Sequence, residues 1–151
     1  MTDLSIAASI DTDVDLAIRP GLRLLHMSTV FAGGFLGTMA RYALFDAHPS
    51  PTSSVDWVLL LVNGSGAFIL GVLVATVFSR RPDAHGLRLF LATGVLGGWT
   101  TYSAIIGGTI TLAHSHHLEA AGGSLLLELV TPPLGAALGL ILGARLNRSS
   151  S

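Results

Sequence analysis

The sequence reads Gly94-Val95-Leu96-Gly97-Gly98-Trp99-Thr100-Thr101-Tyr102-Ser103 in the middle of an apolar segment that extends from Leu87 to Leu112. As a helix rising about 1.5 Å per residue, this segment is long enough to cross a bilayer core of about 30 Å. Glycines at this depth often only allow close packing, but a Gly-Gly pair followed by two threonines also offers a place to unwind. Non-helical backbone persists there only where protein or a cavity satisfies its carbonyls. We therefore expect a transmembrane helix that is broken near its centre.

Three further apolar segments are also long enough to span a membrane: Leu24–Phe45, Trp57–Phe78 and Ser124–Ala144. Half of the 151 residues are apolar and only 11% are charged, whereas about a quarter of the residues of a soluble domain are charged. The mean hydropathy is +0.67. These features predict an all-α membrane protein with four transmembrane helices in one domain, 24–146. A polar arm, 1–23, precedes this domain and a short tail, 147–151, follows it.

Several functions are disfavoured by what the sequence lacks. It contains no cysteine, which excludes disulfides and thiol nucleophiles, and it has no phosphate-cradling loop. The connections between the apolar segments are too short for an extramembrane domain, so the protein must act within or across the membrane. We expect a protein that contacts membrane lipid, is not an enzyme and does not bind nucleic acid.

The basic residues are all arginine, and they are unevenly placed across the expected membrane. Seven of the eight lie on one side, namely Arg19, Arg23, Arg80, Arg81, Arg88, Arg145 and Arg148. Arg41 lies on the other side. Because cytoplasmic loops carry the excess of basic residues, this distribution predicts a multi-pass protein of the plasma membrane with both termini in the cytoplasm.

Two polar residues in the first two segments are candidates for an ion pathway. Arg41 follows Gly33 and Gly37 at steps of one helical turn, so its guanidinium either attracts anions at a pore mouth or reaches the lipid headgroups. Asn63 lies near the middle of the second segment. An amide at that depth is costly without partners, so Asn63 either binds a neighbouring helix or faces a polar path.

The fourth segment carries a narrow polar stripe. At about 100° per residue, Ser124, Glu128 and Thr131 lie on one face of an otherwise leucine-rich helix. An ionisable residue within a span usually faces the protein interior and has a function. The alternative is that Glu128 lies nearer the interface, where water reaches it. Glycines repeat every four residues from Gly135 to Gly143 and indicate a close helix contact.

Taken together, three motifs resemble the signatures of the CrcB/Fluc family of fluoride channels. They are Gly33-Gly34-x-x-Gly37-x-x-x-Arg41-Tyr42, Val62-Asn63-x-x-Gly66-x-Phe68-x-x-Gly71 and Gly97-Gly98-Trp99-Thr100-Thr101-Tyr102-Ser103. They occur in the family's order and on the corresponding helices. The resemblance covers the chain from the first apolar segment to the last.

The resemblance implies an antiparallel dimer with two fluoride pores and a structural sodium ion at its centre. The backbone carbonyls of Gly97 and Thr100 would bind the sodium ion. The fluoride pathway that the family implies would include Arg41, Asn63, Tyr102, Ser103 and Ile105. The polar residues of the fourth segment, Ser124, Glu128 and Thr131, correspond loosely to a further polar track.

This sequence departs from the family pattern at pore-lining positions. Tyr102 stands at the first of two phenylalanines whose ring edges face fluoride, but the second position is Ile105. Gly108 replaces a glutamate, and Leu59 replaces a threonine that is frequent in the family. The packing glycines and the break are retained. The sequence therefore keeps the architecture of the dimer better than its pore.

The leading hypothesis is a channel subunit that exports cytoplasmic fluoride passively and so reduces its toxicity. One alternative is a small proton-coupled multidrug exporter, although such exporters need a carboxylate in the first helix and Glu128 is in the fourth. Another is a non-transporting membrane subunit, such as one that binds haem through His26, which has no evident partner ligand. Seven arginines against one also predict a single orientation, so an antiparallel dimer would require a homologous subunit of opposite orientation.

Overall fold

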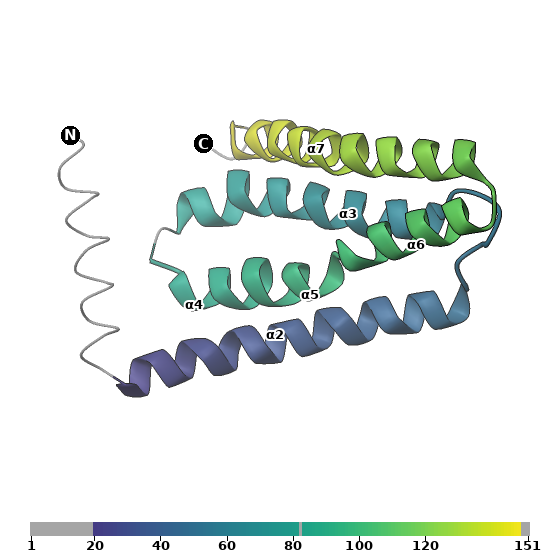
Figure 1. Cartoon of the computed structure of the whole chain (residues 1–151). Coiled ribbons are helices and arrows are strands. Elements are labelled where there is room, and N and C mark those ends of the chain that lie inside the picture. The colour runs from purple at the N-terminus through teal and green to yellow at the C-terminus, as the bar shows by residue number, and fades with distance from the viewer. Residues whose placement is uncertain (1–19, 82, 149–151) are drawn as a thin grey trace.

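The structure, a computed structural model, describes residues 20–81 and 83–148 as helices joined by short connections (Figure 1). In chain order the helices are α2 (Pro20–Ala47), α3 (Trp57–Leu73), its π-helical continuation η1 (Val74–Phe78), α4 (His85–Arg88), the π-helical segment η2 (Leu89–Leu96), α5 (Gly97–Trp99), α6 (Ser103–His114) and α7 (Leu118–Arg148). No strand occurs in these two ranges. The all-α prediction is confirmed for this part of the chain.

The predicted break in the third helical segment is present. α5 ends at Trp99 and α6 begins at Ser103. Between them Thr100 has an extended backbone, with φ −77° and ψ 154°. The break therefore interrupts the segment His85–His114 near its middle, where the Gly-Gly-x-Thr-Thr sequence indicated that it would unwind.

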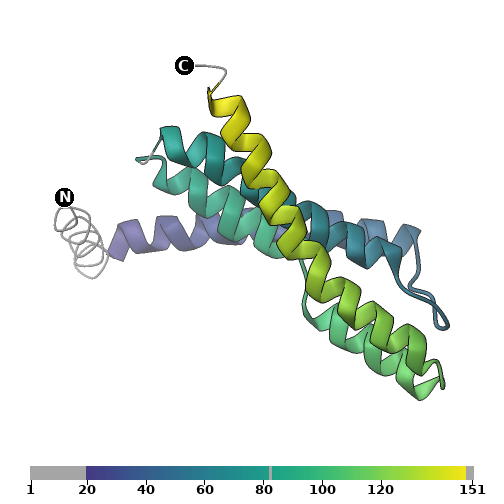
Figure 2. The ribbon, with the colours of Figure 1, turned by 90° about the horizontal axis from the view of Figure 1, so that it is seen from above.

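The break allows the two halves of this segment to contact different helices. α2 packs along η2 and α5, whereas α6 packs along α7. Figure 2 shows α6 beside the N-terminal half of α7, on the side of the break away from α4. α3 and η1 form one rod that also packs along α7. The break consequently lies where the third segment, α3 and α7 come together.

Glycines allow these helices to approach closely, as the sequence predicted. A Cβ atom at Gly37 of α2 would overlap the Val95 carbonyl and lie 2.9 Å from the Trp99 nitrogen. On α7, a Cβ at Gly135 would lie 2.7 Å from the Gly64 carbonyl oxygen. Both distances are too short for real contacts, so the backbones pack at these points as in small-xxx-small helix pairs.

Three helical segments of the described part are long and apolar enough to cross a membrane: Trp57–Phe78, His85–His114 and Leu118–Arg148. α2 has 28 residues and is also sufficient in length, but glycines, hydroxyl residues and Arg41 dilute its apolar character. Large side chains such as Phe31, which is 76% exposed, form an apolar exterior that suits lipid. That α2 is a fourth span stays a prediction.

The helix boundaries match the sequence prediction for the second segment and are wider elsewhere. α3 begins after Asp56, whose side chain caps the helix by accepting hydrogen bonds from two backbone N–H groups. α2 begins at Pro20, inside the expected arm, because proline is compatible with a first helical turn. α7 begins before Ser124 and includes Asn147 and Arg148 of the expected tail. Helices can continue beyond the apolar core because their polar side chains reach the headgroups and water. Residues 1–19 of the arm lie outside the described residues.

Candidate functional site

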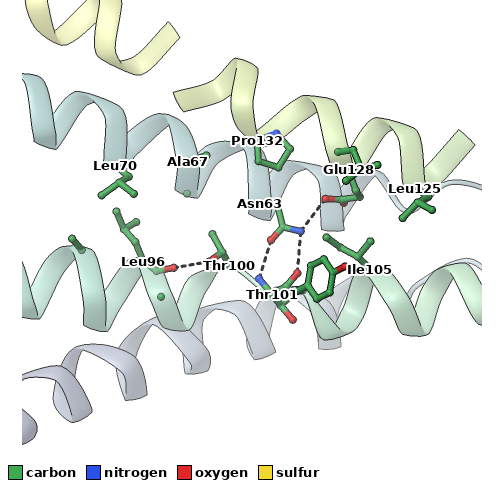
Figure 3. A pocket seen from close by; sticks show the side chains of 15 residues that line it. Asn63, Ala67, Leu70, Leu96, Thr100, Thr101, Ile105, Leu125, Glu128 and Pro132 are labelled. Atoms are coloured by element: carbon green, nitrogen blue, oxygen red, sulfur yellow. Dashed lines mark hydrogen bonds between the residues drawn. The ribbon is translucent and has the colours of Figure 1, made fainter. Parts of the chain in front are cut away.

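A pocket of about 610 Å³ lies at the helix break, between α3, the third helical segment and α7 (Figure 3). Its wall is mainly apolar, but Asn63 of α3, Thr100 and Thr101 of the break, and Glu128 of α7 bring polar groups into it. Pro132 also lines the pocket. The polar groups gather where the backbone of the third segment is not helical.

Asn63 connects the break to α7. Its side-chain oxygen accepts a hydrogen bond from the Thr101 N–H at 2.9 Å. Its side-chain nitrogen donates to the Thr101 carbonyl at 3.2 Å and to Glu128 Oε2 at 2.9 Å. Asn63 is only 4% exposed. The amide therefore replaces helical partners that Thr101 loses at the break, which makes Asn63 both a helix-binding residue and a pocket residue.

Glu128 is the ionisable residue of the pocket, and it is 4% exposed. Its Oε2 atom accepts the bond from Asn63, whereas its Oε1 atom has no hydrogen-bond partner within the described residues. The lining contains no arginine or histidine from that part of the chain. The side chain of Glu128 thus faces the protein interior, as the polar stripe predicted.

Near Glu128 the backbone carbonyls of α7 also lack some of their usual N–H donors. Pro132 and Pro133 lie inside the helix and have no N–H to give to the carbonyls of Glu128 and Leu129, four residues earlier. Glu128, Leu129 and Pro132 all line the pocket. One wall of the pocket therefore includes backbone that lacks its usual helical hydrogen bonds.

The carbonyls of Gly97 and Thr100, which the resemblance assigns to sodium, fit that assignment. In a continuous helix the N–H of Thr101 would bond to the Gly97 carbonyl, but it bonds to Asn63. The N–H of Ala104 would bond to the Thr100 carbonyl, but it bonds to Thr101 Oγ1 at 3.4 Å. Carbonyl oxygens released in this way are suitable ligands for a hard cation.

The structure gathers some predicted site residues at the pocket and leaves others outside its wall. Residues of the wall are Asn63, Gly97, Thr100, Tyr102, Ile105 and Glu128. Residues outside it are Arg41, Ser103, Ser124 and Thr131. Within the wall Ile105 is buried, whereas Tyr102 is 70% exposed.

The four residues outside the wall have different surroundings. Arg41 is half-buried on α2. The Ser103 hydroxyl lies 3.2 Å from the Thr101 hydroxyl. Ser124 is buried, and Thr131 is half-buried beside Gly64. The polar stripe of α7 therefore faces the protein, but only Glu128 of the stripe reaches the pocket.

Thr101 is a site residue that the sequence prediction missed. Its backbone provides two of the three bonds made by Asn63. A signal was available, because an amide near mid-membrane needs partners and a helix break releases backbone groups that can serve as such. Sequence spacing does not indicate which released group meets which amide.

The fold and the pocket define a helical membrane protein whose polar groups gather at an interrupted helix, an arrangement typical of transport proteins. The chain belongs to the CrcB-like protein family, since residues 28–143 match the family described as CrcB-like protein, Camphor Resistance (CrcB). The resemblance drawn from the three motifs is thereby confirmed.

Relatives of this chain are named fluoride-specific ion channels. The chain is 41% identical over 113 residues to the fluoride-specific ion channel FluC 2 of Thermobifida fusca. The matched region covers 74% of this chain and 80% of the relative. It is 40% identical over 124 residues to FluC 2 of Leifsonia xyli, covering 78% and 83%. It is 33% identical over 128 residues to FluC of Agrobacterium fabrum, covering 82% and 99%.

Proposed function

We propose that this chain is a subunit of a fluoride-selective channel and that fluoride passes through the pocket at the helix break. The observation that carries this proposal is the family membership, with relatives named fluoride-specific ion channels. The pocket beside the broken helix, with its few polar groups, supplies a location for the pathway. Fluoride efflux from liposomes, with chloride as the control anion, tests the proposal.

Passive conduction is sufficient for the proposed role in fluoride resistance. Hydrogen fluoride is a weak acid that crosses membranes as the neutral molecule and dissociates inside the cell. A selective path for the anion then lets fluoride leave along its electrochemical gradient. Such a path must bind the ion firmly enough for entry and weakly enough for exit. A mainly apolar pocket with a few polar groups suits that requirement.

The proposed channel has four membrane spans per subunit, with α2 as the first, and two subunits in antiparallel arrangement. The 28-residue length of α2 and its glycine-mediated packing on the third segment support the first part. The 70% exposure of Tyr102 at the pocket wall supports the second, because a second subunit would cover this ring. The positive edge of an aromatic ring can then face an anion.

A structural sodium ion belongs to this proposal. The carbonyls of Gly97 and Thr100 would hold it, together with the equivalent groups of the second subunit. When bound, the ion supplies positive charge at the centre of the dimer. The non-helical backbone around Thr100 and the diverted N–H groups of Thr101 and Ala104 support these two carbonyls as its ligands.

We predict that the chain inserts with both termini in the cytoplasm. In Figure 1 the start of α2, the α3–α4 connection and the end of α7 lie at one end of the bundle. Six arginines belong to these regions, namely Arg23, Arg80, Arg81, Arg88, Arg145 and Arg148, whereas Arg41 lies toward the other end of α2. Reporter fusions to the C-terminus should give cytoplasmic signal only.

A fixed orientation has a consequence for assembly. An antiparallel pair of identical chains needs insertion in both directions, so a chain locked in one direction needs a homologous partner of the opposite arginine bias. Such a partner could supply the aromatic edge that Ile105 lacks. Equal cytoplasmic and external reporter signals would contradict the fixed orientation and favour a homodimer instead.

A further inference from the structure

The carboxyl oxygen Oε1 of Glu128 is not explained by the three motifs that resemble the family's signatures, because none of them includes Glu128. Oε1 is buried and has no hydrogen-bond partner in the described part of the chain, although its carboxyl group lines the pocket. Buried polar atoms are nearly always hydrogen-bonded, so an exception calls for a specific cause. A ligand of the pocket is one such cause.

The amide nitrogen of Asn63, a residue of the expected fluoride pathway, already makes two hydrogen bonds. An amide nitrogen has two hydrogens, and those of Asn63 point to the Thr101 carbonyl and to Glu128 Oε2. The Thr100 hydroxyl donates to the Leu96 carbonyl at 3.0 Å. While these bonds are intact, neither Asn63 nor Thr100 has a hydrogen left for an anion.

Glu128 can supply the missing donor in only one of its two protonation states. Ionised, it offers Oε1 as a further acceptor and places a negative charge beside the path of an anion, which opposes entry. Protonated on Oε1, it keeps Oε2 as the acceptor for Asn63 and directs an O–H group to the pocket. A hydrogen bond from this O–H to fluoride would be charge-assisted and therefore strong.

We propose that Glu128 in its neutral acid form is the hydrogen-bond donor to fluoride in this pocket, and that ionisation of Glu128 closes the path. The proton stays on Oε1 while the anion passes, so no covalent bond forms or breaks. Conduction then falls as the pH rises through the titration of Glu128. This inference rests on the proposed fluoride channel function.

The helices packed against α7 carry other titratable groups, and Asp56 provides a control. α3 contributes Asp56, which caps its N-terminus, and α6 has Tyr102 at its start and His114 at its end. η1 contributes none. Asp56→Asn keeps a capping side chain while removing the charge, so this variant separates a titration of Asp56 from one of Glu128.

The first test measures fluoride efflux from liposomes between mildly acidic and alkaline pH, after subtraction of the leak from protein-free liposomes. Wild-type efflux should fall about tenfold per pH unit above the midpoint, as the acid form is depleted. Glu128→Gln retains an N–H donor that does not titrate, so its efflux should be independent of pH. Glu128→Ala should conduct poorly at every pH, and Asp56→Asn should keep the wild-type profile.

The second test does not require conduction. Infrared spectra should contain the carbonyl stretch of a protonated carboxyl group that is absent from Glu128→Gln. Sodium fluoride should shift this band and sodium chloride should not.

Wild-type efflux that is equal at all pH values would overturn the inference and leave the channel function in place. An infrared band that is insensitive to fluoride would also overturn it. Absence of efflux from every variant at every pH would instead count against the proposed function of the chain alone, and the infrared result would still decide the role of Glu128.

Discussion

Asn63→Leu is expected to abolish fluoride efflux and to destabilise the helix break. Leucine has the same branching at Cγ but removes three hydrogen bonds at once, two with the Thr101 backbone and one with Glu128. These partner groups are buried and would be left unsatisfied. Each such loss costs about 1–3 kcal/mol in soluble proteins and less between membrane helices, so we expect a loss of about 2–4 kcal/mol in unfolding free energy.

Efflux and thermal unfolding of the purified protein check this prediction together. Ser65→Ala is a control on the same helix, because it removes a half-buried polar contact, from Trp99 Nε1 to Ser65 Oγ at 3.1 Å, that lies outside the pocket. It should keep most of the efflux. Wild-type efflux by Asn63→Leu would show that Asn63 has no part in the pathway.

The double variant Asn63→Leu/Glu128→Leu separates the stability of the network from its role in conduction. Removing both partners leaves no orphaned carboxyl group, so part of the stability should return. The double variant should then be more stable than the sum of the two single losses predicts, by about 0.5–3 kcal/mol. Fluoride efflux should remain abolished, because the double variant regains stability but has no side chain at these two positions that can donate a hydrogen bond to fluoride.

Gly37→Ala is expected to separate α2 from the third helical segment. The added Cβ would overlap the Val95 carbonyl, which is backbone and cannot rotate away. Overpacking of this kind costs about 1–3 kcal/mol. Because η2 and α5 carry the break, the displacement should also reduce efflux. Thermal unfolding and efflux of the variant measure both effects.

Gly34→Ala is the matched control on the same helix. Its added Cβ would lie 3.9 Å from the Gly94 carbonyl oxygen, an ordinary contact distance. Alanine is favoured over glycine within a helix by about 1 kcal/mol, so this variant should be as stable as wild type or slightly more so. Equal stability of the two variants would mean that the close approach at Gly37 contributes nothing to the fold.

The position of the break was predictable because its cause is local. Glycines and threonines at the centre of the third segment weaken helix formation within a few residues of one another, and Thr100 indeed has an extended backbone. The glycine contacts of α2 and α7 were predictable for the same reason, since a spacing of four residues places small residues on one helix face.

The network at the break was predictable only in part because it joins distant positions. Asn63 and Glu128 are 65 residues apart, and their contact depends on how α7 crosses α3. The polar stripe indicated that Glu128 faces inward, but did not indicate that Glu128 bonds to Asn63. Ser124 and Thr131 share that stripe and still lie outside the pocket wall, which α7 lines with Leu125, Leu129 and Pro132 beside Glu128. Thr131 lies within this length of the helix but packs beside Gly64 of α3.

The most direct test of the central claim is anion efflux from liposomes that contain the purified chain together with the subunit with which it pairs, measured with electrodes selective for fluoride and for chloride. The pathway at the helix break predicts rapid loss of fluoride and retention of chloride, with Asn63→Leu liposomes retaining both anions. Loss of chloride as fast as fluoride, or equal fluoride loss from wild-type and Asn63→Leu liposomes, would contradict a fluoride-selective path through this pocket.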